Sequence, residues 1–144
     1  MTTDATTAWE ALTLAHTAMT RELTDLLDLT PTGLREYEVM NVLSRVGEEG
    51  MRLHHLNEHI PLTQSSLSRL TERLVTRGLI HSWQDPIDRR GTRYRLTSAG
   101  VTKHAIIASH HHRIIRANME AALTPDEIDT LTQLTAKLHL QEAR

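Results

Sequence analysis

Residues 62–80 read "LTQSSLSRLTERLVTRGLI", a stretch that joins a helix start, an amphipathic helix and a helix stop. Thr63 predicts the start, because its hydroxyl can accept a hydrogen bond from a free amide of the next turn. Gly78 stands where a left-handed C-cap is favoured, and so predicts the end. Between them, leucines recur at three- and four-residue steps and predict one inward face: Leu67, Leu70 and Leu74.

The outward face of this helix carries side chains that suit contact with DNA. Its first turn is rich in short polar groups that can reach base edges or phosphates, and arginines follow at four-residue steps as far as Arg77. A polar, solvated helix face is the plain alternative. A serine-rich turn followed by three arginines is less usual, so we favour DNA binding. The candidate DNA-binding residues of this segment are Thr63, Gln64, Ser65, Ser66, Ser68, Arg69 and Arg73.

A second charged stretch follows at residues 85–97, which read "DPIDRRGTRYRLT". Its proline and glycine predict a turn, and the short alternating runs "LIHSW" and "TRYRL" on either side predict two paired strands. Alternation along the second strand places Arg93 and Arg95 on one face and Tyr94 on the other. Because a turn does not need four arginines, the stretch suggests a probe for an anionic partner.

The segments around these two motifs place them in a winged helix-turn-helix. A helix over about 34–46 and a short helix over about 52–59 precede the turn "HIPLT", after which come the capped helix and the hairpin. Long helices flank this part of the chain: residues 5–29 before it, and after it a helix from Thr97 to about residue 122. A last helix begins with the capping-box sequence "TPDE". The predicted fold class is therefore mainly α.

Composition and charge narrow the functions that are open to the chain. Its net charge is −2, yet residues 63–97 hold seven arginines against three acids, whereas residues 1–50 hold three arginines against nine acids. The basic window therefore presents a local positive field that the bulk charge hides. The absence of cysteine excludes thiol chemistry and Cys-ligated zinc. Without a signal peptide or a long apolar run, we expect a cytoplasmic location and no membrane partner.

Two stretches of the chain resemble the MarR-type winged helix-turn-helix transcriptional regulators. They are residues 62–80 and residues 85–100, which read "DPIDRRGTRYRLTSAG". The resemblance covers nearly the whole chain, because the flanking helices stand in the expected order. It implies a single MarR-like domain over 1–144, with a DNA-binding part over about 34–97 and dimerisation helices over about 5–29 and 98–144. It also implies a homodimer on double-stranded DNA, at a near-palindromic operator whose half-sites lie one duplex turn, about 34 Å, apart.

The resemblance further implies a role for the tip of the hairpin. Members of the family carry an Asp-x-Arg pattern there and insert the arginine into the minor groove, and Asp88 and Arg90 occupy these positions. The carboxylate of Asp88 can hold the guanidinium of Arg90 in one orientation, and a narrow A·T-rich groove attracts such an arginine. We expect Asp88, Arg89 and Arg90 to belong to the DNA-binding site. Arg89, Arg93 and Arg95 would be phosphate contacts or parts of the hairpin shaft.

Apolar stripes on the first and last helices exceed what a small winged domain can cover, so we expect them to meet a second copy of the chain. The stripe of the first helix consists of Trp9, Leu12, Ala15, Met19, Leu23, Leu26 and Leu27. The stripe of the last helix consists of Ile128, Leu131, Leu134, Leu138 and Leu140.

The ten histidines, with "SHHHR" at residues 109–113, raise the question of a metal site. Adjacent helical residues point about 100° apart, so three consecutive histidines cannot share one metal ion, and their i, i+4 partners are not ligands. His55 and His59 have the right spacing but lie beside the DNA-reading turn. We assign no metal site and no cofactor, and keep a zinc- or pH-responsive regulator of the same fold as an alternative.

The function we expect is that of a sequence-specific transcriptional regulator, a repressor, without enzymatic activity. Family members commonly bind small aromatic or anionic molecules between the dimer helices and the winged part, which leaves room here for a small-molecule effector at residues that the sequence does not identify. The alternative from another class is a helical protein-interaction module without DNA binding. No Gly-rich phosphate loop, nucleophile elbow or metal-ligand set supports catalysis.

Overall fold

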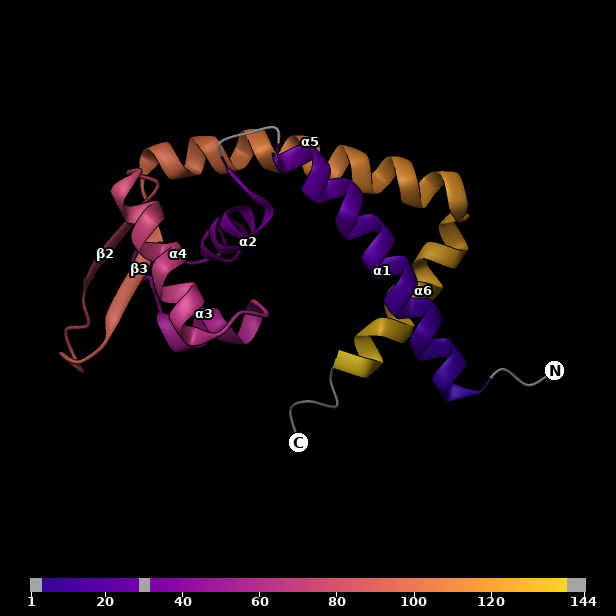
Figure 1. The fold of residues 1–144 in the computed structure, drawn as a ribbon, viewed down its shortest axis with the longest axis horizontal. Coiled ribbons are helices and arrows are strands. Elements are labelled where there is room, and N and C mark those ends of the chain that lie inside the picture. Colours follow the sequence, from indigo (N-terminus) through magenta and orange to yellow (C-terminus); the bar gives the residue numbers. More distant parts are fainter. Residues whose placement is uncertain (1–3, 29–31, 140–144) are drawn as a thin grey trace. The chain divides into compact units, whose positions relative to one another are not determined.

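The computed structural model describes residues 4–28 and 32–139, and the chain divides into two compact units, residues 1–109 and 110–144 (Figure 1). The first unit holds α1 (Ala5–Asp28), α2 (Leu34–Leu43), β1 (Met51–Arg52), α3 (Leu53–His59), α4 (Gln64–Thr76), β2 (Ile80–Gln84), β3 (Thr92–Leu96) and the first turns of α5 (Ser98–Ala122). The second unit holds the rest of α5 and α6 (Pro125–His139). None of the described helices has the length and apolarity needed to cross a membrane.

The predicted fold class and order of elements are confirmed. The chain is mainly α, and the pair α3–α4 followed by the β2–β3 hairpin forms the winged helix-turn-helix. The helix ends follow the predicted chemistry: the Thr63 hydroxyl accepts a hydrogen bond from the Ser66 amide at 3.2 Å, and Gly78 adopts a φ of +71° after α4. At the start of α6, the Glu127 carboxylate accepts from the Thr124 amide at 2.8 Å, as the capping box predicts.

Two boundaries differ from the prediction. Helix α2 ends at Leu43 rather than near residue 46, because a turn closes there and the Val46 amide donates to the Leu43 carbonyl at 3.1 Å. Residue 52, expected to begin the third helix, instead forms strand β1 with residue 51 and pairs with β3, so that the sheet has three strands in the order β1–β3–β2. A strand of two residues is too short to show an alternating pattern in the sequence.

The core of the first unit lies between α2, α3, α4 and the inner face of the sheet. The leucines predicted to point inward from α4 are buried, and Tyr94 of β3 is buried on the same side, as the alternation predicted. The buried hydrophobic residues of this core are Tyr37, Val39, Met40, Leu43, Leu56, Ile60, Leu67, Leu70, Leu74, Leu79, Ile80, Tyr94, Ile107 and Ala108. The predicted end of the first helix at residue 29 and, of the predicted stripes, residue 140 and the side chains of Leu26 and Leu27 lie outside the described part of the chain.

The start of α5 is fastened to the segment that follows α4. The Thr97 amide donates to the Leu79 carbonyl at 3.1 Å, and the Thr97 hydroxyl donates to the Gly78 carbonyl at 2.6 Å. The same hydroxyl accepts from the Gly100 amide at 3.0 Å and so caps α5. Gly100 is buried there, and a Cβ at this position would overlap the carbonyl oxygen of Leu79. The close approach of the two segments therefore requires glycine.

Replacing Gly100 by alanine should lower the free energy of unfolding by about 1–3 kcal/mol, the range for overpacking a tightly packed site. Urea titration followed by circular dichroism measures the loss. Gly33→Ala is the control, since a Cβ at residue 33 meets no atom within 4 Å; it replaces only the favourable N-cap of α2 and should lower the free energy of unfolding by less than about 1 kcal/mol. Equal effects of the two substitutions would contradict the close approach.

Candidate nucleic-acid interface

The first turn of α4 presents a cluster of hydroxyl groups at the surface. The Thr63 hydroxyl lies 2.9 Å from that of Ser66 and 3.3 Å from that of Ser65, and it caps the helix. Thr63, Gln64, Ser65, Ser66 and Arg69 are exposed, whereas Ser68 is half-buried. The cap fixes the direction of this turn. Its polar side chains and free amides are therefore exposed where an anionic partner could bind.

Of the three arginines at four-residue steps along α4 and its end, not all remain free to contact a partner. Arg77 forms an ion pair with Glu36 of α2, and its Nη2 also donates to the Thr32 hydroxyl at 3.0 Å. Arg73 lies on the same side, with its Nε 3.8 Å from the other oxygen of Glu36, but its side chain remains 63% exposed. Arg77 therefore joins α4 to α2, contrary to the expectation that it extends a free outer face.

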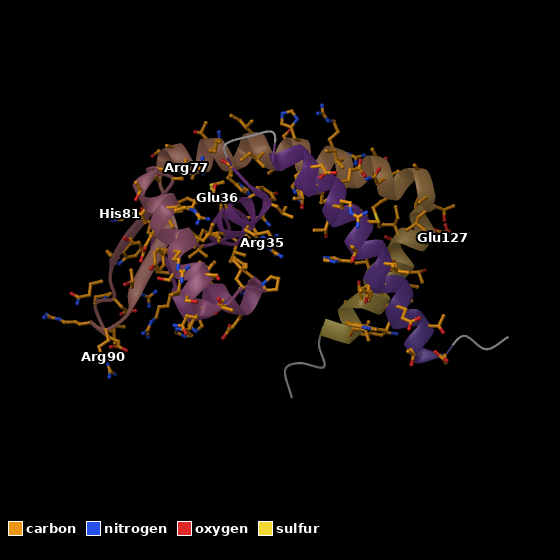
Figure 2. The ribbon with its side chains drawn as sticks, viewed as in Figure 1. Arg35, Glu36, Arg77, His81, Arg90 and Glu127 are labelled. Atoms are coloured by element: carbon orange, nitrogen blue, oxygen red, sulfur yellow. The ribbon has the colours of Figure 1, made fainter. Side chains whose placement is uncertain are left out.

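Figure 2 shows one arginine that joins two helices and another that lies exposed at the end of the hairpin. Arg77 and Glu36 lie between α4 and α2, whereas Arg90 lies at the far end of the hairpin. Glu36 was not identified from the sequence, because it stands 41 residues before its partner and no local spacing links the two.

At the tip of the hairpin, Asp88 holds Arg90 at two points. One oxygen of the Asp88 carboxylate accepts from the Arg90 amide at 3.2 Å and from Arg90 Nε at 3.4 Å. The other oxygen accepts from Arg52 Nη2 at 3.3 Å, which joins the tip to strand β1. These bonds, the Arg90 amide first, lower the pKa of Asp88. The side chain of Arg90 is nevertheless 93% exposed.

Asp85 anchors the base of the same turn and was missed by the sequence reasoning. The residue is 1% exposed, and one carboxylate oxygen accepts from the amides of Ile87 and Asp88 at 2.8 and 3.1 Å. The other oxygen accepts from Arg93 Nε at 2.8 Å. The two amide bonds, followed by the Arg93 contact, lower the pKa of Asp85 to about 2. An aspartate two residues before the loop apex is a turn signal that could have identified it.

The remaining arginines of the hairpin divide between shaft and surface. Arg93 also donates from Nη1 to the carbonyls of Glu49 and Gly50 at 3.0 and 3.3 Å, so it belongs to the shaft. Arg95 lies over the Trp83 ring, 5.6 Å from its centroid, at the base of the hairpin. Arg89 is exposed, and its carbonyl accepts from Gln84 Nε2 at 2.7 Å.

The histidines form no compact ligand set in the part of the chain that the structure describes. No group of three or more His, Cys, Asp or Glu side chains there is placed to hold a metal ion. His55 and His59 are exposed on α3, and His104 Nε2 lies 3.1 Å from Asn41 Oδ1, with its ring stacked on Tyr37. A cavity of about 440 Å³ lies elsewhere in the first unit, lined by α1, the start of α2 and α4, including Arg35, Glu36 and Arg73.

The winged part of the chain is similar to a known family of domains. Residues 33–100 match the family model of a winged helix DNA-binding domain. No curated protein sequence matches the chain.

Three solved structures from Streptomyces coelicolor resemble the chain in fold. AbsC, a MarR family transcriptional regulator, is 24% identical over 99% of this chain and 97% of its own, with a TM-score of 0.81. The PcaV transcriptional regulator, solved with its natural ligand, is 25% identical over 95% and 92%, with a TM-score of 0.70. Sco3205, a MarR family transcriptional regulator solved in complex with DNA, is 22% identical over 96% and 88%, with a TM-score of 0.82. The resemblance drawn from the two sequence motifs is confirmed.

The bonds of Asp85 predict a pH-dependent contribution to stability. Because the pKa of Asp85 in the folded chain is about 2, below its ordinary value of 3.8, its stabilisation is fully present above about pH 4 and disappears as the pH falls toward 2. Asp85→Asn should therefore lower the thermal midpoint at pH 7, and the difference from the parent should shrink between pH 4 and pH 2.

Thermal melts followed by circular dichroism across this pH range measure the difference. Glu48→Gln, which removes an exposed acid from the neighbouring loop, is the control and should leave the midpoint nearly unchanged. A deficit in Asp85→Asn that stays constant from pH 7 to pH 2 would show that the carboxylate charge is not responsible.

Proposed function

We propose that this chain, a winged helix DNA-binding protein with the MarR-type fold, represses transcription as a homodimer bound to a near-palindromic operator. The observation that carries the proposal is the pairing of two exposed elements in one unit. The capped first turn of α4 offers short polar groups and Arg69, and the wing tip offers Arg90 held by Asp88. A helix start suits base edges in the major groove, and a presented arginine suits the minor groove.

The roles of individual residues follow from this arrangement. Gln64, Ser65, Ser66 and Arg69 lie where they can read base edges, and Arg90 enters the adjacent minor groove. Thr63, Ser68, Arg73 and Arg89 contact phosphates or support the turn, and Asp88 orients Arg90. Sco3205, which shares this fold, was solved in complex with DNA, in keeping with such a use of the winged part.

Dimerisation is supported by the apolar surface that the single chain leaves uncovered. No described residue of the second unit is buried, although α6 carries Leu134 at 53% and Leu138 at 58% exposure. On α1, Trp9 is 66% exposed. Exposed apolar faces on long helices are typical of subunit interfaces, and a second copy provides the same faces in return.

An effector belongs to the proposal as well. PcaV, with the same fold, was solved with its natural ligand. In this chain, the cavity of about 440 Å³ beside α4 is of the size that small ligands occupy, and it contains Arg35 and Arg73. A ligand there would compete with Glu36 for Arg73, and so would act on the helix proposed to read DNA.

The test of DNA recognition is selection of bound sequences from a random duplex pool, repeated with candidate effectors and with zinc. We expect a palindrome of roughly 15–20 bp, the length that two half-sites one turn apart require. On that duplex, Arg90→Ala should weaken binding several-fold or more and reduce the negative slope of log affinity against log salt by about one phosphate contact. Fluorescence anisotropy at several salt concentrations measures both quantities.

Arg95→Ala is the matched control, because it removes the same charge from the base of the hairpin, where Arg95 lies against Trp83. It should change affinity much less than Arg90→Ala. Unchanged affinity in Arg90→Ala would refute the minor-groove role, whereas recovery of no motif and a flat salt dependence would favour a protein-interaction module.

Dimerisation has its own test in Leu134→Glu, which places a charge on the exposed apolar face of α6. Sedimentation equilibrium should give twice the chain mass for the parent and a single chain mass for the variant, because burying an unpaired carboxylate opposes association. Thr132→Glu adds the same charge on roughly the opposite side of the helix and should remain dimeric. A monomeric parent at micromolar concentration would argue against the proposed dimer.

A further inference from the structure

The tip of the wing exposes an isoleucine almost completely. Ile87 is 91% exposed, more than any other large hydrophobic residue in the described part of the chain. The other large hydrophobic residues that are more than half exposed lie on α1, α5 and α6, helices that the proposed dimer would cover at least in part. Ile87 lies instead in the loop between β2 and β3, so that dimer does not account for it.

Hydrogen bonds hold the backbone of the loop at Ile87. The Ile87 amide donates to the buried Asp85 carboxylate at 2.8 Å, and the Asp85 amide donates to the Gly91 carbonyl at 2.8 Å, which closes the base of the loop. Asp85 is fixed in turn by Arg93 of β3. An apolar side chain on a fixed backbone can be covered by a partner with little loss of conformational entropy.

The same loop presents a cation beside this apolar group. Arg90 stands three residues further on, in a turn closed by the bond from the Gly91 amide to the Asp88 carbonyl at 2.9 Å. Its side chain is 93% exposed at the far end of the hairpin (Figure 2). One loop therefore offers a guanidinium held by a carboxylate and, three residues before it in the chain, an uncovered branched aliphatic side chain.

This combination matches the chemistry of the minor groove of DNA. The floor of the groove has a negative potential that attracts arginine, and its walls are the C–H groups of deoxyribose, against which aliphatic side chains pack. Proteins that enter the minor groove frequently carry isoleucine, leucine or proline beside their cations. We propose that Ile87 is an apolar minor-groove contact that packs against the sugars next to Arg90. This inference rests on the proposed function and adds to it a contact that does not depend on charge.

The alternative to DNA is a protein partner that covers Ile87 on the outer face of the wing. A cavity of about 480 Å³ runs along that face and has Ile87 at its edge, together with Pro86 and Trp83. Its lining carries Glu48 and Glu49 together with Arg93 and Arg95, so its formal charges balance, whereas Arg89 and Arg90 add exposed positive charge at the tip itself. The charge around Ile87 therefore favours a duplex.

The experiment compares Ile87→Ser, Ile87→Val and Arg90→Ala in anisotropy titrations with the selected duplex at several salt concentrations. Ile87→Ser should lose roughly ten-fold in affinity, as expected for uncovering most of an isoleucine, with the salt slope of the parent retained. Ile87→Val should lose about three-fold or less, because most of the apolar surface remains. Arg90→Ala differs from both, since it reduces the salt slope.

Hydroxyl-radical footprinting provides a second measurement, because the radical attacks deoxyribose from the minor groove. At a protein concentration that saturates the duplex, Ile87→Ser should lose protection of the sugars protected by the wing and keep protection elsewhere. Affinity within two-fold of the parent together with an unchanged footprint would overturn the inference while leaving the proposed function intact. Failure of the parent itself to bind any duplex would overturn both.

Discussion

The buried carboxylate of Asp85 is the interaction on which the wing depends. It accepts two amides of the turn and the guanidinium of Arg93, and Arg93 in turn binds the carbonyls of the loop before β1. A charge in a site that is 1% exposed is stable only because each oxygen has such partners. These bonds join the hairpin to the loop before β1, whereas an isolated pair of strands would be only marginally stable.

Asp88 makes a second set of ion pairs in the same hairpin loop. Its carboxylate lies between Arg52 of β1 and Arg90 of the tip, so one acid contacts both a shaft arginine and an exposed one. Glycine at position 91 leaves space for the Arg52 side chain, which a Cβ there would meet. The orientation of the exposed arginine thus depends on residues from strands that are distant in sequence.

The elements near the two motifs could be predicted because their signals are local. Thr63, Gly78 and the leucines of α4 determine a helix through capping and periodicity, and the hairpin follows from alternation around a Pro-Gly turn. Strand β1 could not be predicted, because its two residues form a strand only through their pairing with β3, which is distant in sequence. In the same way, the sequence showed that arginines were abundant, but not which of them Glu36, Asp85 and Trp83 would engage.

Because some of the seven arginines are paired within the chain, their number overestimates how many phosphates the protein can neutralise. Counterion release is proportional to the phosphates that a protein neutralises, not to its formal charge. Arg77 and Arg93 are already paired within the first unit, and Arg73 shares Glu36 with Arg77. For the proposed DNA binding, the negative slope of log affinity against log salt is therefore expected to be shallower than seven unpaired arginines would give.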